Sequence, residues 1–307
     1  MAAPEDQDTI PPPLRSTALG RTTTWSEQPS AEVRVDCAGA SDRGKVREDN
    51  QDHFYLGRLG RFSQSIATSL PAGELPDRLE QAGHVAVVAD GMGGHAGGEV
   101  ASRTAIIVFF HLLFDTPDWV LKVDDESALK ILDRVGDRYR SLDSLLEERS
   151  QIDPNLRGMG TTMTLTYSLG FDLFLAHAGD SRAYLCRNGS LKQLTRDHTR
   201  VQELVDAGML TREEAATHRL RNVLTNVLGG GVPLTDVDLH RIALAAGDVV
   251  LLCSDGLYDV VKDDEIASIL SGSPSAQAAC RSLLDLALLR GAPDNVTAVV
   301  SRYEALS

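Results

Sequence analysis

Cysteine is scarce in this 307-residue sequence, and it follows no pattern. The four cysteines are scattered along the chain and form no CxxC pair: Cys37, Cys186, Cys253 and Cys280. A chain of this length with so few and such widely spaced cysteines does not have the composition of a disulfide-stapled secreted domain. We therefore expect four reduced thiols in a cytoplasmic protein.

Long apolar runs and excess positive charge are also missing. No segment reaches the roughly 20 apolar residues that a helix needs to span a bilayer, and the N-terminus lacks the apolar core of a signal peptide. Lysine and arginine total 30 against 44 acidic residues, so the formal net charge is −14. This charge argues against nonspecific nucleic-acid binding and against docking on an anionic membrane. It leaves phosphate chemistry open, because bound cations can reverse the local field.

Composition divides the chain into a leader and a folded part. Residues 1–30 are rich in proline, threonine, serine and charge, which predicts a disordered leader. The folded domain is expected to cover residues 31–304 and to begin with an edge strand near Val33. Glycine and proline recur through residues 57–83, which predicts a long loop of the kind that is either functional or disordered.

Periodicity predicts both helices and strands. Apolar residues at helical spacing predict helices over 98–114 and 126–149, and threonine alternates with apolar residues from Gly158 onward. We interpret residues 158–194 as a meander of antiparallel strands with a two-residue turn at Asn188-Gly189. Residues 196–230 predict two short helices in a lobe laid on the main sheet. Further helices are expected from about residue 263 and over 275–289, before a last strand over 296–300.

One segment has the pattern of a binding site. The apolar residues 85–89 run directly into Asp90, and glycines follow at positions 91, 93 and 94. A carboxylate at the end of a buried strand is costly to bury unless it is paired or bound to a metal. The glycines allow a tight turn and a close approach to a ligand. The alternative is an ordinary strand–turn–helix corner with a solvated aspartate.

The same pattern recurs along the chain. Asp180 and Asp255 also stand at strand ends beside glycine, Asp294 directly precedes a strand, and Asp52 begins one. Several such acids on one β-rich domain indicate that they converge at one end of the sheets. Carboxylates without a cysteine or histidine pair at ligand spacing favour Mg²⁺ or Mn²⁺ over Zn²⁺. Two such ions would suit the hydrolysis of a phosphate ester.

Six segments together resemble one protein family. They cover about residues 33–303 in the family's order: 47–52, 88–98, 160–162, 178–184, 253–257 and 294–297. On these segments the chain resembles the type 2C metal-dependent Ser/Thr protein phosphatases in their bacterial form. The resemblance implies an α+β fold, a four-layer α-β-β-α sandwich of two antiparallel sheets flanked by helices, with a metal site at one end. It also makes residues 196–230 a variable flap beside that site.

The resemblance assigns the metal ligands by position. It implies two Mn²⁺ or Mg²⁺ ions, bridged by Asp90, with the carbonyl of Gly91 on one of them. Asp255 and Asp294 would complete the other ion, and Asp52 would act directly or through a water. The family's third and weaker metal position would be held by Asp180 together with Asp255.

Two further residues would act on the substrate. Arg47 would hold the phosphate, because a planar guanidinium suits bidentate contact with it. His95 matches the histidine proposed as the general acid for the leaving alkoxide, and the alternative is that His95 only orients the backbone of its glycine-rich turn. The sequence departs from many relatives at Gln51, where they have glutamate, and in the length of the segment 57–83.

The activity implied is hydrolysis of phosphoserine and phosphothreonine in proteins by a water that bridges the two ions. The expected partners are phosphorylated proteins, with a Ser/Thr kinase and its substrates, and the expected assembly is a monomer without nucleic acid or membrane. One alternative is a regulatory module of the same fold that binds phosphoproteins without turnover, although an inactive relative would be expected to lose Asp90, Asp255 or Asp294. Another is a phosphatase that acts on a partner-switching regulator. Its sensor would be a separate protein, because residues 1–30 are too short to form one.

Overall fold

The computed structural model describes residues 33–67, 69, 78–93, 97–114, 125–231 and 234–306. Five described strands form the first sheet, in the spatial order β1 (Val33–Asp42), β12 (Val296–Ala305), β11 (Val249–Cys253), β7 (Arg182–Arg187) and β8 (Ser190–Gln193). Every neighbouring pair in this sheet is antiparallel. The edge strand expected near Val33 is confirmed as β1, and Asn188 and Gly189 form the expected turn between β7 and β8.

The second sheet is also antiparallel. Its spatial order is β10 (Asp238–Ala243), β6 (Asp172–Ala178), β5 (Met163–Leu169), β3 (Arg78–Met92), β4 (Gly160–Thr161) and β9 (Leu228–Gly229), and β2 (Asp52–Gln64) pairs with β3. Small apolar side chains from both sheets meet between them, among them Val88 and Leu175 from the second sheet and Leu252 and Val299 from the first. This shared core holds the two sheets face to face.

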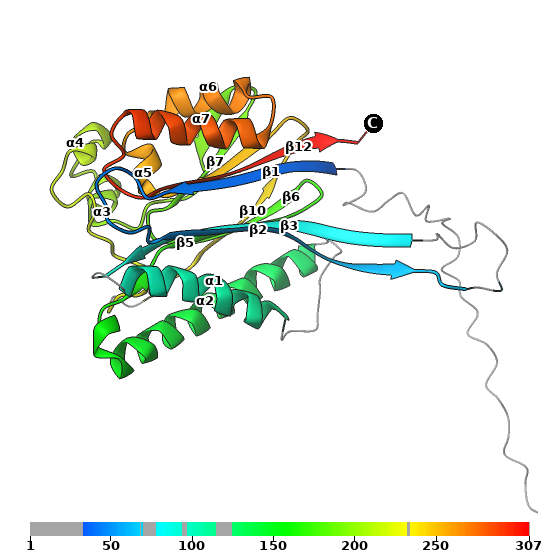
Figure 1. Ribbon diagram of the computed structural model, residues 1–307, viewed down its shortest axis with the longest axis horizontal. Coiled ribbons are helices and arrows are strands. Elements are labelled where there is room, and N and C mark those ends of the chain that lie inside the picture. Colours follow the sequence, from blue (N-terminus) through cyan, green and yellow to red (C-terminus); the bar gives the residue numbers. More distant parts are fainter. Residues whose placement is uncertain are drawn as a thin grey trace, which may run out of the picture.

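Helices cover the outer face of each sheet and give the four layers visible in Figure 1. The second sheet is covered by α1 (Gly97–Phe114) and α2 (Asp125–Ile152), and the first by α6 (Asp263–Gly272) and α7 (Ala276–Leu289). Buried Val135, Tyr139, Leu142 and Leu146 form the stripe of α2 that faces the sheet, as their helical spacing predicts. Shorter helices lie at one end of the sandwich: α3 (Arg200–Asp206), α4 (Arg212–Ala216) and α5 (Asp255–Tyr258). A 3₁₀ turn, η2 (Pro154–Leu156), follows α2.

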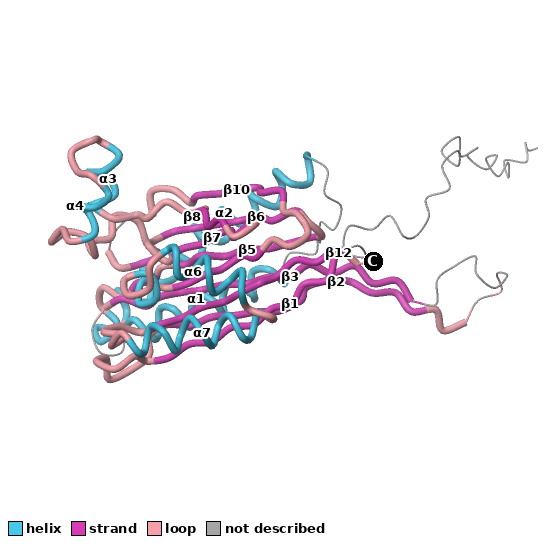
Figure 2. Tube along the Cα trace, turned by 90° about the horizontal axis from the view of Figure 1, so that it is seen from above, coloured by secondary structure: helices cyan, strands magenta, loops and turns pink. Residues whose placement is uncertain are grey.

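Two expectations about the strands are wrong. Residues 57–64 and 78–83 of the predicted loop belong to an extended hairpin, because β2 runs to Gln64 and pairs with β3 from Arg78 onward. This hairpin projects past the other strands at the end away from α3 and α4 (Figure 2). Its glycines and exposed polar residues obscured the strand pattern. The predicted meander is broken as well, because β6 and β7 belong to different sheets and residues 179–181 cross between them.

The predicted leader, residues 1–30, and the predicted site residue His95 lie outside the described residues. Among the described helices, none is long and apolar enough to cross a membrane.

Candidate metal and phosphate site

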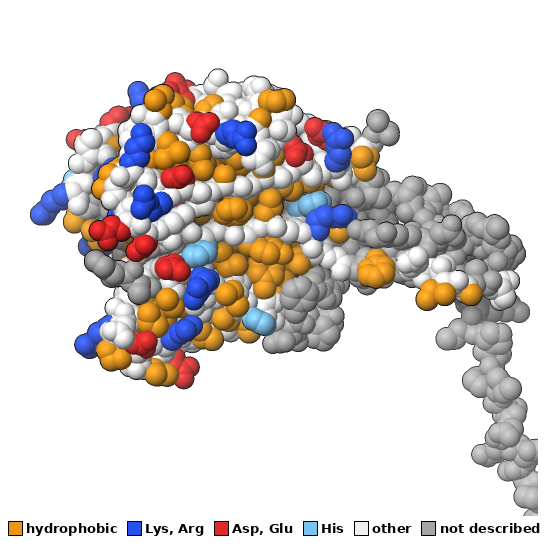
Figure 3. Space-filling view, viewed as in Figure 1, with side chains coloured by type: hydrophobic (Ala, Val, Ile, Leu, Met, Phe, Trp, Pro, Cys, Tyr) orange, Lys and Arg blue, Asp and Glu red, His pale blue; other side chains and the backbone are white. Residues whose placement is uncertain are grey.

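The candidate site lies where strands of both sheets end or begin. Asp52 opens β2, Asp90 lies near the end of β3, and Asp180 lies between β6 and β7. Asp255 begins α5 directly after β11, and Asp294 comes two residues before β12. The antiparallel topology therefore brings residues distant in sequence to one end of the sandwich. On the face visible in Figure 3, acidic and basic side chains lie close together at this end.

A pocket of about 580 Å³ opens at this end. Six of the eight residues predicted for the site line it: Arg47, Asp90, Gly91, Asp180, Asp255 and Asp294. Gln51, Thr162 and Asn295 contribute to its wall. The convergence of the acids, expected from their positions at strand ends, is thus confirmed for the described residues.

Asp52 is the seventh predicted residue, and it lies buried beneath the pocket with 4% of its surface exposed. The buried hydroxyls of Ser254 and Thr297 donate to its Oδ2 at 2.6 and 2.8 Å. These hydroxyls belong to the first sheet, whereas Asp52 belongs to the second, so the carboxylate links the two layers. Its other oxygen, Oδ1, is buried without a hydrogen-bond partner, which is costly for a carboxylate unless a cation or its water reaches it.

The β2–β3 register places Asp52 directly opposite Asp90. Like charges at opposed positions of a sheet are destabilising, so this pair is hard to explain by stability alone. The backbone of Asp90 is fixed by two threonines. Thr161 Oγ1 donates to the carbonyl of Asp90 at 2.8 Å, and the amide of Asp90 donates to Thr162 Oγ1 at 3.0 Å. Thr161 and Thr162 therefore orient Asp90.

Four of these carboxyl groups resist ionisation. Burial raises the pKa of Asp52 to about 6 against the hydrogen bonds of Ser254 and Thr297. Burial, assisted by repulsion from Asp197, raises the pKa of Asp180 to about 7. Burial followed by the nearby carboxylates raises the pKa of Asp90 and of Asp255 well above the usual value. Several acids that disfavour their own negative charge create a strong local demand for cations.

Close backbone packing explains why the residue after Asp90 is a glycine, Gly91. A Cβ atom on Gly91 would lie 2.1 Å from the carbonyl oxygen of Gly98 and 2.9 Å from that of Gln51. The start of α1 and the end of the β1–β2 connection therefore press against the strand at this point, and no larger residue fits. This packing places the carbonyls of Gly98 and Gln51 against the backbone of the residue that follows Asp90.

The donor set fits a hard divalent ion. Carboxylate and carbonyl oxygens surround the pocket, and Mg²⁺ and Mn²⁺ prefer such ligands. The unpaired Oδ1 of Asp52 supplies a further oxygen. Within the described part of the chain, no three Asp, Glu, His or Cys side chains already stand as a finished set of metal ligands. The acids share one pocket, and rotation of their side chains would be needed to bring them onto a common ion.

Arg47 occupies the rim of the pocket. Its Nη2 donates to Asp294 Oδ2 at 2.6 Å, and the two side chains are 58% and 33% exposed. The residue predicted to hold phosphate therefore pairs with a residue predicted to hold metal. Asn295 holds the loop that carries Arg47, because its Nδ2 donates to the carbonyls of Arg43 and Asp49. The guanidinium can reach the pocket while its backbone stays anchored.

The comparisons with known proteins agree with this geometry. A family model described as protein phosphatase 2C matches residues 77–285. The chain belongs to the protein phosphatase 2C family. It is 39% identical over 264 residues to a Mycobacterium tuberculosis protein named serine/threonine protein phosphatase PstP. The matched region covers 86% of this chain and 44% of that protein. The chain thus spans less than half the length of this relative.

Two further matches show the extent of the similarity. A Streptococcus pyogenes protein named putative protein phosphatase 2C-type is 35% identical over 86% of this chain and 96% of its own length. The crystal structure of the PstP catalytic domain in complex with two manganese ions has a TM-score of 0.69 and 36% identity, covering 89% of this chain and 99% of that one. The α+β sandwich expected from the sequence is confirmed by the observed layers and by this similarity.

Sequence reasoning missed the residues that hold the protein phosphatase 2C site from behind. Ser254 directly follows the apolar strand β11 and Thr297 lies in the largely apolar β12, and a small polar residue at such a place was the available signal. Asn222 and Leu224 of the predicted flap line the pocket, and no pattern singled them out. His198 was also passed over, although it is buried and makes several hydrogen bonds.

Proposed function

We propose that this protein is a protein-serine/threonine phosphatase that hydrolyses phosphoserine and phosphothreonine with a water held between two Mn²⁺ or Mg²⁺ ions. The observation that carries the proposal is the convergence of Arg47 and four aspartates on one pocket of a protein phosphatase 2C fold. When bound, the ions supply a water of lowered pKa and neutralise the charge of the phosphate.

The residues of the chain divide the remaining work. Asp90 would bridge the ions, with the Gly91 carbonyl on one and Asp255 and Asp294 on the other. Asp52 would orient the metal shell from below through its unpaired Oδ1. The remaining pocket acid, Asp180, would hold a third, weaker ion together with Asp255.

Arg47 would bind the phosphate. Its side chain is more than half exposed at the rim, so it can exchange Asp294 for a phosphate oxygen. A charge-assisted, bidentate contact of this kind orients the ester for attack by the water. The phosphate would then lie between the guanidinium and the acids below.

The direct test is an assay on a phosphothreonine peptide after chelation and dialysis. Activity should be absent in chelator and return with Mn²⁺ or Mg²⁺. Asp90→Asn should lose on the order of a thousandfold in kcat/KM, which corresponds to about 4 kcal/mol. Asp285→Asn, at an exposed position on α7, should match wild type. Phosphopeptide binding without phosphate release in the presence of either metal would instead favour the regulatory module.

His95 is proposed as the general acid from its place in the sequence. An alkoxide needs a proton when it leaves, whereas a nitrophenolate leaves readily without one. His95→Ala should therefore slow hydrolysis of a phosphothreonine peptide on the order of 100-fold and slow p-nitrophenyl phosphate far less. Equal losses on both substrates would show that His95 only supports the backbone of its turn.

A further inference from the structure

His198 joins the segment that carries Asp180 to the predicted flap. It is buried, with 6% of its surface exposed, and lies just before α3. The backbone amide of His198 donates to the carbonyl of Gly179 at 2.7 Å, and the amide of Gly179 donates back to the ring nitrogen Nδ1 of His198 at 3.1 Å. His198 thus hydrogen-bonds both the carbonyl and the amide of Gly179, the residue that precedes Asp180.

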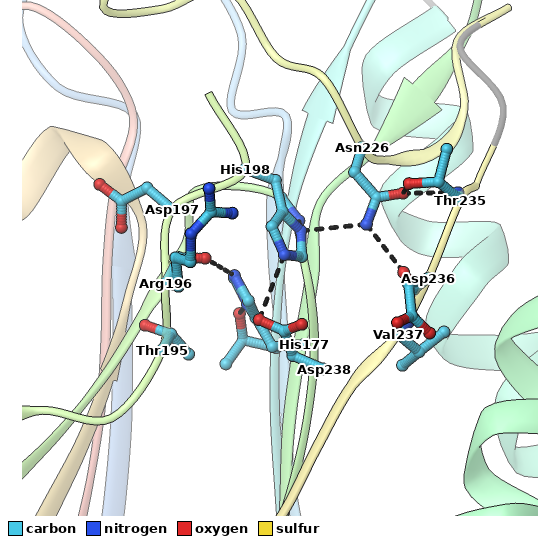
Figure 4. Close-up of polar contacts among 12 residues, drawn as sticks. His177, Thr195, Arg196, Asp197, His198, Asn226, Thr235, Asp236, Val237 and Asp238 are labelled. Carbon is cyan, nitrogen blue, oxygen red and sulfur yellow. Dashed lines mark hydrogen bonds and ion pairs between the residues drawn. The ribbon is translucent and has the colours of Figure 1, made fainter. Parts of the chain in front are cut away.

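The hydrogen bonds fix the protonation of this ring. A backbone amide can only donate, so Nδ1 of His198 must carry the lone pair. The side-chain amide of Asn226 also points at Nδ1, at 3.1 Å, and its oxygen accepts from the backbone amide of Thr235 (Figure 4). The proton of the neutral ring therefore sits on Nε2, which donates to Asp238 Oδ2 at 3.2 Å. Each polar atom of the imidazole has a defined partner.

The same residue ties the two ends of the flap together. The carbonyl of His198 accepts from the amide of Thr225 at 2.9 Å, and the next residue, Thr199, forms an isolated β-bridge with Leu224. Leu224 lines the candidate pocket. His198 therefore lies where the first and last segments of the flap meet, next to a residue of the pocket wall.

The neighbouring residue, Asp197, makes a second connection to the turn at Asp180. Asp197 accepts three hydrogen bonds from Arg182, whose guanidinium lies 3.6 Å from the ring centre of Tyr258. The hydroxyl of Tyr258 donates to the carbonyl of Asp180 at 3.0 Å. Residues 197 and 198 thus reach the turn at Asp180 from two sides.

We propose that His198 is a positioning residue, which uses Nδ1 as an acceptor to fix the Asp180 turn and the flap in one arrangement. The backbone at Gly179 is closely packed in a conformation that favours glycine. Its φ is +116°, and a Cβ there would lie 2.5 Å from Thr162 Cβ. Only its link to metal and substrate rests on the proposed function. The hydrogen bond itself can be measured without either.

Two substitutions separate the two ring nitrogens. In His198→Asn, the amide oxygen can take the place of Nδ1 and keep an acceptor for Gly179 and Asn226. In His198→Gln, the longer side chain can place a donor near Asp238 but leaves no acceptor at the Nδ1 position. A role as mere filling would favour glutamine, which is closer to histidine in volume. An acceptor role favours asparagine.

The first readout is hydrogen exchange of the Gly179 amide by NMR in metal-free protein. We expect exchange in His198→Asn to stay within a few-fold of wild type, and exchange in His198→Gln to accelerate on the order of tenfold or more. If the glutamine variant does not fold, the asparagine variant still decides. Lost protection at Gly179 in His198→Asn, or full protection in His198→Gln, would overturn the proposal.

The second readout is Mn²⁺ binding by calorimetry. Residues that orient metal ligands typically change affinity 10- to 100-fold when replaced. The glutamine variant should lose on the order of tenfold at the weakest site, the one assigned to Asp180, and the asparagine variant should not. Equal Mn²⁺ affinities in wild type and the glutamine variant would contradict the coupling to Asp180. If the wild-type protein shows no metal-dependent hydrolysis, the proposed function is wrong. The exchange pattern would still test the hydrogen bond between the Gly179 amide and Nδ1 of His198.

Discussion

Replacing Asp180 by asparagine should make the metal-free protein more stable. Burial raises the pKa of this carboxyl from 3.8 to about 7, assisted by Asp197 and opposed by Arg182. At 1.36 kcal/mol for each pKa unit, ionising Asp180 in the fold at pH 8 costs up to about 4 kcal/mol. Because neighbouring carboxylates share this cost, we expect Asp180→Asn to gain about 1–3 kcal/mol in free energy of unfolding.

The pH dependence gives the sign of the effect. Between pH 3.8 and 7, folded Asp180 keeps a proton that the unfolded chain has lost, so the penalty on wild type grows as the pH rises through this window. Urea unfolding in chelator should therefore show no difference between variant and wild type near pH 4 and the full difference at pH 8. Asp285→Asn removes an exposed charge and should stay within about 0.5 kcal/mol of wild type throughout.

Saturating Mn²⁺ should reverse the order, because a ligand that binds only the folded state stabilises the protein that holds it. Wild type should gain more from the metal than Asp180→Asn does. A variant that is no more stable than wild type at pH 8, or a difference that does not change with pH, would refute the assignment of Asp180 to a charge-strained pocket.

Two further predictions concern Arg47 and His177. Arg47→Ala should raise KM for a phosphopeptide about tenfold or more, since a charge-assisted contact is worth about 1.5–3 kcal/mol, while calorimetry should show Mn²⁺ bound as well as before, because Asp294 loses its partner. Lost Mn²⁺ binding with unchanged KM would make Arg47 structural. Burial lowers the pKa of His177 to about 4 against the attraction of Asp197 and Asp238. Its contribution, about 3 kcal/mol, should be present above pH 6.5 and fade as the pH falls toward 4. His177→Asn should flatten this part of the stability curve, and an identical curve would show that His177 does not titrate as described.

The sequence indicated the convergence of the acids on one pocket more completely than the strands that support them. Asp90, Asp180 and Asp255 were found because a charged residue beside glycine at the end of an apolar strand is locally unusual. Their convergence followed from antiparallel topology, which returns successive strands to the same end. By contrast, the outer part of the hairpin of β2 and β3, residues 57–64 and 78–83, was predicted as loop, because its pairing depends on a register of 13 residues on each strand that local propensity does not encode.

The supporting contacts could not be read from sequence for a different reason. Thr297 lies on β12 and Ser254 directly follows β11, and both meet Asp52 of the opposite sheet, so their role exists only after the two sheets have packed. His198 acts on Gly179 through a backbone amide and a ring nitrogen, and neither leaves a residue pattern. The crossing from β6 to β7 between sheets was hidden by the same lack of long-range information.

Anomalous diffraction from crystals grown with Mn²⁺ tests the central claim most directly, because it locates the ions independently of any assay. We expect one manganese peak on each side of the Asp90 carboxylate, one near the Gly91 carbonyl and the other between Asp255 and Asp294, with Arg47 released from Asp294 when a phosphate analogue is present. Manganese bound elsewhere, or a pocket that stays empty of manganese at saturating concentration, would contradict it.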